Sequence, residues 1–177
     1  VFVSTDDNQI AEIAKEYGAK IPFLRPANIS DDFSTDKDVR DHFINWLKKE
    51  NMKVDYLCYL YPTAPFISVK TLLECYKLLI EKNATSSQTI TTFPYPILRA
   101  QKKDKDNFIQ FNWKENAQRR SQDLPEFFHD AGQCYFFNLK KYQDKEKIVG
   151  YQIPRLYSQD IDTLEDFLFA EKLFQII

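Results

Sequence analysis

The sequence predicts an α/β fold with a Rossmann-like, mostly parallel sheet sandwiched by helices. Short apolar runs rich in β-branched and aromatic residues alternate with segments of helical spacing, which is the pattern of β-α units. At 177 residues, the chain is expected to form a single domain over residues 1–177. Ligands bind such sheets beyond the carboxyl ends of the strands, so polar residues at those ends are candidate site residues.

The first part of the chain is predicted to contain two strands joined by a helix, followed by a second helix. Residues 1–5 and 21–24 are short apolar or β-branched runs. Between them, Thr5-Asp6-Asp7 is a helix-start signature, and Gly18 marks the end of that helix. The second helix is indicated by apolar residues at helical spacing, namely Val39, Phe43, Trp46 and Leu47.

The middle of the chain repeats this order of strand and helix. Tyr56–Tyr61 is a continuous apolar run, typical of a fully buried strand, and Pro62-Thr63-Ala64-Pro65 ends it. A helix is predicted over residues 69–81 and another strand over residues 87–93.

Residues 104–130 do not show the β-α pattern. Within them, Phe108–Trp113 alternates like one strand of an exposed hairpin. Because a long apolar edge is usually covered, this hairpin is predicted to mediate dimerisation. Strands resume at residues 135–137 and 148–153, with a short basic helix near Lys140.

Two aspartates near the C-terminus form the main candidate site. Leu156–Asp162 is predicted to be a strand, so Asp160 and Asp162 would lie on one face, roughly 7 Å apart, and could share one hard cation. The alternative is that both merely solvate a strand end. A capping-box pattern starts a helix at Thr163. The predicted buried face of that helix consists of Leu164, Phe167, Leu168 and Phe174.

Composition argues against several classes of protein. The net charge of −2 and the pI of about 5.8 provide no basic surface for nucleic acid. No apolar run approaches the ~20 residues of a membrane span. The three cysteines are odd in number and sit in apolar contexts, which is typical of free thiols in a cytoplasmic protein. The three glycines are not clustered, so a glycine-rich phosphate loop is missing from this sequence.

Several stretches together resemble the cytidylyltransferases that activate nonulosonic acids, the sialic-acid group of sugars. They occur in family order along almost the whole chain. These stretches are Val3–Asp7, Ile10–Ala14, Phe23–Ala27, Tyr61–Phe66, Arg120–Pro125 and Asp160–Thr163.

Within that family, Asp130–Tyr135 resembles the pseudaminic-acid branch more than the N-acetylneuraminate branch. The latter usually has Asn-Gly where Ala131-Gly132 stands and Gln where Tyr61 stands. The family also opens with a strand and a triphosphate-binding loop that this chain does not match. The resemblance therefore implies that the 177 residues lack the N-terminal strand and phosphate loop.

The resemblance implies a fold of the nucleotide-diphospho-sugar transferase type and a reaction between CTP and an acidic nine-carbon sugar. The anomeric hydroxyl of the sugar would attack the α-phosphate of CTP and release pyrophosphate. Such transfer depends on positioning and on neutralising charge, usually by Mg²⁺. Asp160 and Asp162 are then the expected Mg²⁺ ligands and catalytic residues. No side chain is an evident general base, and a homodimer is expected.

The remaining candidate residues each have a structural alternative. Arg25 and Ser34 match cytidine contacts of the family, but they could instead be strand-end and turn residues. Six residues are expected on the sugar side, although they could serve as core, turn or solvated surface. They are Tyr61, Thr63, Arg120, Gln122, Gln133 and Tyr135, and residues 104–130 are expected to form a sugar-side insertion.

Two rival functions stay open from the sequence. The first is activation of another acid sugar, such as N-acetylneuraminate, legionaminate or Kdo. The second is a non-catalytic chain that binds a nucleotide or a protein partner, because the triphosphate loop is not matched.

Overall fold

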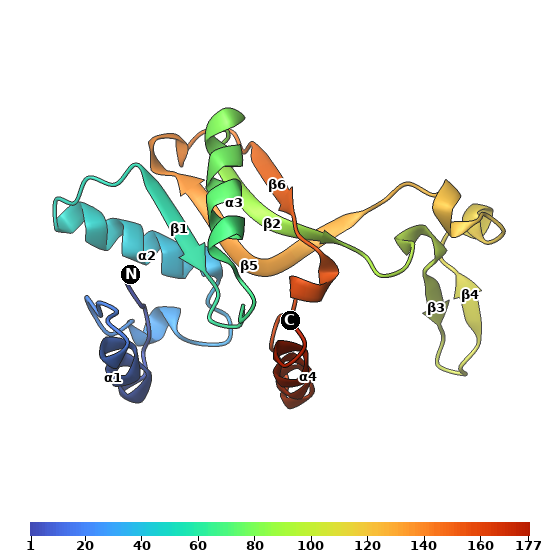
Figure 1. Cartoon of the computed structure of the whole chain (residues 1–177), viewed down its shortest axis with the longest axis horizontal. Coiled ribbons are helices and arrows are strands. Elements are labelled where there is room, and N and C mark those ends of the chain that lie inside the picture. The colour runs from blue at the N-terminus through green and yellow to red at the C-terminus, as the bar shows by residue number, and fades with distance from the viewer. The chain divides into compact units, whose positions relative to one another are not determined.

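The computed structural model describes all residues from Val1 to Ile177, which form two compact units (Figure 1). The first unit is Val1–Val54 and the second is Asp55–Ile177. The expected single domain over residues 1–177 stays a prediction. None of the helices combines the length and the apolar character needed to cross a membrane.

The first unit is a small β-α-β arrangement followed by a longer helix. Its extended segments pair in parallel through two bridges, Phe2 with Lys20 and Thr5 with Leu24. Helix α1 (Asn8–Glu16) connects them, and the side chain of Asp7 accepts hydrogen bonds from the first turn. The predicted strands and helix are therefore present, although each strand is reduced to isolated bridges. Helix α2 (Asp36–Lys49) begins with a capping box between Thr35 and Asp38.

Aromatic rings hold α2 against the bridged segments. The Phe2 ring lies 5.4 Å from that of Phe43 and 5.5 Å from that of Trp46, measured between centroids. Phe23 meets the His42 ring edge-on at 4.5 Å. Such edge-on and tilted contacts add to the burial of apolar area.

The second unit is built on a four-stranded sheet in the order β1-β5-β2-β6. The strands are β1 (Tyr56–Leu60), β2 (Ser86–Thr92), β5 (Phe128–Asn138) and β6 (Ile148–Gln152). Strand β5 is antiparallel to both neighbours, and β2 and β6 are parallel. The α/β class is confirmed, but the sheet is mixed rather than mostly parallel in its pairing. The reason is that no crossover helix separates β2 from β5, so the chain returns antiparallel.

Helix α3 (Val69–Glu81) packs on this sheet, as Figure 1 shows, and encloses its core. The buried core cluster consists of Cys75, Leu79, Ala84, Cys134 and Phe136. The hydroxyl of Ser87 donates to the carbonyl of Cys75 at 2.8 Å, which satisfies a polar group inside this core.

Strand β1 is less buried than its apolar sequence predicts. It lies at one edge of the four-stranded sheet and pairs only with β5 there. Leu60 is 44% exposed, and Cys58 is exposed as well. The continuous apolar run of β1 therefore predicted a strand correctly, but the prediction that this strand is fully buried is wrong.

A small hairpin follows β2, formed by β3 (Gln101–Lys103) and β4 (Ile109–Phe111). The carboxylate of Asp104 accepts from the backbone of Asp106 and Phe108 and so shapes the turn. Phe108 is 74% exposed, as the sequence predicted for this hairpin. The remaining short elements are single 3₁₀ turns at Ala27–Ile29, Ile97–Arg99, Lys114–Asn116, Ser121–Asp123, Leu139–Lys141 and Arg155–Tyr157.

The predicted strand over Leu156–Asp162 is wrong. After β6, Pro154 leads into the 3₁₀ turn Arg155–Tyr157, and residues 158–162 form no ladder. Proline fixes its own φ and lacks the N–H that a ladder needs, so the chain leaves the sheet there. The predicted helix start is confirmed, because Thr163 and Asp166 form a capping box for α4 (Leu164–Phe174).

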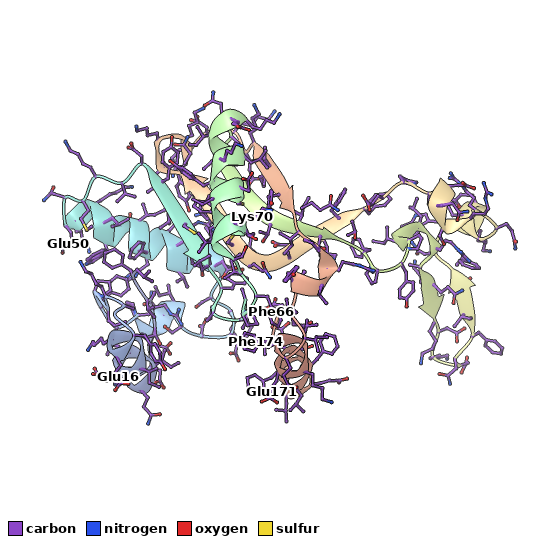
Figure 2. All side chains as sticks on the ribbon, in the orientation of Figure 1. Glu16, Glu50, Phe66, Lys70, Glu171 and Phe174 are labelled. Atoms are coloured by element: carbon purple, nitrogen blue, oxygen red, sulfur yellow. The ribbon has the colours of Figure 1, made fainter.

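The predicted buried face of α4 is also wrong. Leu164, Phe167, Leu168 and Phe174 are 73%, 52%, 47% and 72% exposed. The buried residues of this helix are Ala170 and Leu173. Figure 2 labels Phe174 beside Phe66, and their rings are 6.4 Å apart between centroids.

Candidate active site

The centre of the candidate site is an irregularity in β5 opposite β2. The pairing of β5 with β2 shifts register between Gln88 and Ile90, which face Tyr135 and Asp130. The extra residues of β5 bulge out of the ladder, and Gly132 takes a φ of +62° there. One carboxylate oxygen of Asp130, Oδ1, accepts from the Gly132 N–H at 2.9 Å and holds the bulge. Bulges commonly re-aim side chains beside functional sites.

Asp160 reaches this bulge from the segment after β6. A Cβ atom on Gly132 would lie 2.7 Å from Oδ2 of Asp160, so the carboxylate occupies the space that a larger residue would fill. The Ile161 N–H donates to Oδ1 of Asp160 at 3.1 Å. Contact with a glycine therefore positions Asp160, instead of the strand alternation that the sequence suggested.

Asp162 follows two residues later with an exposed side chain. Its backbone N–H donates to Oδ2 of Asp166 at 3.3 Å, which ties it to the start of α4. The chain contains no group of three or more His, Cys, Asp or Glu side chains able to hold a metal ion. Mg²⁺ commonly uses only one or two protein carboxylates and takes its other ligands from phosphate and water. The donor set of Asp160 and Asp162 therefore fits Mg²⁺.

Three tyrosines line the same part of the sheet. The Tyr135 ring lies 5.2 Å from that of Tyr61 and 6.4 Å from that of Tyr59, between centroids. The Tyr135 hydroxyl donates to Oδ2 of Asp130 at 2.9 Å. Burial, followed by this hydrogen bond, raises the pKa of Tyr135 far above its usual range. Its phenol is therefore protonated throughout the physiological range.

Gln133 and Thr63 have mainly structural surroundings. The Gln133 side chain is 1% exposed, and its amide donates to the carbonyl of Tyr157, which fastens the turn that leads to Asp160. The backbone carbonyl of Gln133 accepts from the Tyr61 N–H at 3.1 Å. Thr63 lies in a tight turn closed by the Ala64 N–H and the Tyr61 carbonyl.

Arg120 and Gln122 lie at the 3₁₀ turn Ser121–Asp123, in the segment between β4 and β5. The Arg120 guanidinium forms a two-pronged pair with Asp123, with Nε 2.7 Å from Oδ2 and Nη2 3.1 Å from Oδ1. Its side chain is 72% exposed. Gln122 lines a cavity of about 280 Å³ whose walls are mostly proline and aromatic side chains.

Arg25 is anchored within the first unit. Its guanidinium donates to Ser30 Oγ at 3.0 Å, to Asp6 Oδ1 at 3.0 Å and to the Ser4 carbonyl at 3.4 Å. Ser34 instead donates to Asp31 Oδ1 at 2.7 Å, in a local turn. The ion pair between Arg25 and Asp6 joins the ends of the two bridged segments, whereas the hydroxyl of Ser34 is used within its own turn.

Of the predicted residues in the second unit, the structure groups Tyr61, Gln133, Tyr135 and Asp160 around Gly132. Asp130 is not among the site residues predicted from the sequence, although an Asp two residues before a Gly is a recognisable signal for a side chain that caps a turn. Ser30 is not among them either, because its contact with Arg25 depends on the fold.

Comparison with known proteins gives concordant results. A family model described as cytidylyltransferase matches residues 1–176. The chain is 35% identical over 181 residues to a pseudaminic acid cytidylyltransferase of Campylobacter jejuni, covering 99% of this chain and 78% of the relative. It is 26% identical to a CMP-N,N'-diacetyllegionaminic acid synthase of Legionella pneumophila, over 99% of this chain and 78% of that one.

Among solved structures, the chain resembles a CMP:2-keto-3-deoxy-manno-octonic acid synthetase determined in complex with CTP. The TM-score is 0.59 at 14% sequence identity, covering 97% of this chain and 81% of that one. This likeness confirms the predicted fold type.

Proposed function

Because this chain belongs to the cytidylyltransferase family, we propose that it activates pseudaminic acid with CTP to give CMP-pseudaminic acid and pyrophosphate. The observation that carries the proposal is the 35% identity to a pseudaminic acid cytidylyltransferase over 99% of the chain. In the reaction, the anomeric oxygen of the sugar forms a bond to the α-phosphorus of CTP. The bond from that phosphorus to the pyrophosphate oxygen breaks, and the hydroxyl proton is released.

Asp160 and Asp162 are the proposed ligands of Mg²⁺, which would neutralise charge on the phosphates. The structure supports this role through the placement of Asp160, whose carboxylate lies against Gly132 and is oriented by the Ile161 N–H. Asp162 is exposed and is the better candidate for the direct ligand of the metal.

The other proposed contacts follow the two units. Arg25 and Ser34 in the first unit are proposed to contact cytidine. In the second unit, the wall made by Tyr61 and Tyr135 is proposed to face the sugar. The remaining proposed contacts on the sugar side are Thr63, Arg120, Gln122 and Gln133.

The proposal is tested by measuring pyrophosphate release from CTP and Mg²⁺ with a panel of acid sugars. The panel contains pseudaminate, N-acetylneuraminate, N,N'-diacetyllegionaminate and Kdo, and pseudaminate is expected to react fastest. The variant Tyr61→Gln should weaken that preference, because a phenol and an amide present different donors to a sugar oxygen. A clear preference of the unaltered protein for another sugar would contradict the assignment.

We propose that the enzyme works as a homodimer in the cytoplasm. The exposed apolar side chains of Phe108 and Ile109 on the β3–β4 hairpin support an association surface. All three cysteines are free thiols, which supports a reducing compartment. Light scattering tests the assembly, and a monomer at micromolar concentration would count against the dimer.

A further inference from the structure

Asp130 forms two hydrogen bonds that connect the backbone bulge to the tyrosine wall. Oδ1 accepts from the Gly132 N–H at 2.9 Å, and Oδ2 accepts from the Tyr135 hydroxyl at 2.9 Å. Both carboxylate oxygens are thus engaged by donors of β5 itself. The carboxylate cannot donate in its ionised form, so the direction of both bonds is fixed.

The fixed direction has a consequence for Tyr135. A phenol has one hydrogen, and here that hydrogen points to Asp130. Toward any other partner, the Tyr135 oxygen can therefore only accept. The ring of Tyr61 lies beside that of Tyr135, with 5.2 Å between the centroids. The direction of the bond from Tyr135 to Asp130 is thus fixed, and the remaining capacity of the phenol oxygen is to accept.

We propose that Asp130 is a specificity-determining positioning residue, which makes the Tyr61–Tyr135 wall a hydrogen-bond acceptor and so selects sugars that present an N–H or O–H donor there. This inference rests on the proposed function, because it assumes that the wall faces the sugar. The rings of Tyr59, Tyr61 and Tyr135 lie within 5.2 to 6.4 Å of one another and supply an apolar surface around the acceptor. Sites that pair a buried polar group with one substituent reject analogues that leave it unpaired.

The variant Asp130→Asn reverses the direction of the hydrogen bond to Tyr135 with little change in the shape of the side chain. Its amide oxygen can still accept from the Gly132 N–H and keep the bulge, while its NH₂ group donates to the Tyr135 oxygen. The Tyr135 hydrogen is then turned toward the sugar, where it meets the donor of the substrate. Tyr135→Phe removes the phenol oxygen altogether, and Asp144→Asn is the matched control because Asp144 is exposed outside this site.

The experiment measures KM for pseudaminate, KM for CTP and thermal midpoints for the single variants and for the Asp130→Asn/Tyr135→Phe double variant. Asp130→Asn should raise KM for the sugar by about 10-fold or more, leaving KM for CTP within about twofold. In the Tyr135→Phe background, the same change should alter KM for the sugar by less than about twofold, because the two residues act through one bond. Asp144→Asn should match the unaltered protein.

Two results overturn the inference in an active enzyme. One is an unchanged KM for the sugar in Asp130→Asn or in Tyr135→Phe. The other is an equal effect of Asp130→Asn with and without the Tyr135 oxygen. If no sugar on the panel reacts, the proposed function itself fails, and the substrate role of Asp130 is overturned with it. Ultraviolet titration of the tyrosines tests the bond between Asp130 and Tyr135 independently of activity. Loss of the Asp130 charge should make Tyr135 ionise at lower pH whether or not the protein is active.

Discussion

Gly132 and Asp160, from segments far apart in the chain, approach so closely that a Cβ atom on Gly132 would lie 2.7 Å from Oδ2 of Asp160. A glycine is required at this position for two reasons. A Cβ atom would collide with Asp160, and the φ of +62° is a conformation that other residues adopt only at a cost in free energy. The conformation of the bulge in β5 and the position of the carboxylate proposed to hold the metal therefore depend on each other.

The variant Gly132→Ala should lower both stability and turnover. The left-handed backbone costs roughly 1–2 kcal/mol for a residue with a Cβ, and the added methyl displaces Asp160. A displacement of about 1 Å in a catalytic group can reduce turnover by about 10²-fold. The measurements are urea unfolding and initial rates of pyrophosphate release.

Gly18→Ala is the matched control for this variant. Gly18 has a φ of +83°, but nothing lies within 4 Å of an added Cβ. It should therefore lose stability through backbone strain while keeping its turnover. Equal losses of turnover in the two variants would show that strain alone, and not contact with Asp160, explains the effect.

Removing either proposed metal ligand should abolish most of the activity. Asp162→Asn is expected to reduce turnover by at least ~10²-fold, the usual scale for a key electrostatic group. The fold should persist, because Asp162 is exposed. Chelation of divalent cations should stop the reaction and added Mg²⁺ should restore it. Near-normal rates in Asp162→Asn at low Mg²⁺ would refute the assignment.

Alanine substitutions of Leu79 and Leu73 on α3 distinguish the contribution of core packing to stability from that of helix formation. Leu79 is 1% exposed and belongs to the core cluster, so Leu79→Ala should cost about 2–5 kcal/mol in free energy of unfolding. Leu73 is 61% exposed on the same helix, and Leu73→Ala should change that free energy by about 0.5 kcal/mol or less. Chemical denaturation compares the two, and similar losses would mean that α3 does not pack on the sheet as described.

The half-buried phenol of Tyr135 predicts a loss of stability at alkaline pH. Burial and the bond to Asp130 raise its pKa in the folded state. The stabilisation is complete below about pH 10, the pKa of an unfolded tyrosine, and decreases as the pH rises above it, because the unfolded chain then releases the proton first. Tyr135→Phe should be less sensitive to pH between about 10 and 11. The exposed Tyr17 provides the control, and Tyr17→Phe should retain the full sensitivity.

Local patterns predicted most helices and several strands with accuracy. Helix α3 occupies Val69–Glu81, the range that apolar spacing indicated, and Thr163 with Asp166 caps α4 as expected. These features depend on contacts between residues a few positions apart, so a single sequence contains the necessary information.

The sequence misjudged features that depend on remote neighbours. Strand β5 runs from Phe128, earlier than its aromatic residues suggested, and its antiparallel pairing follows from the connection after β2. The segment at Asp160 resembled a strand by alternation, but no strand pairs with it. Periodicity describes the two faces of an extended chain, whereas hydrogen-bond partners are supplied by the rest of the sheet.

By itself, the sequence determined the family resemblance and the α/β class, and it predicted Asp160 and Asp162 as candidate metal ligands. Only the tertiary structure decided how Asp160 is held, because its contact with Gly132 joins β5 to the segment that follows β6 in the chain. It also decided the role of Asp130, whose two acceptor oxygens reach Gly132 and Tyr135 only because β5 bulges between them. The physical reason is that hydrogen-bond direction and close packing are set by atoms within a few ångströms in space, which sequence order does not specify.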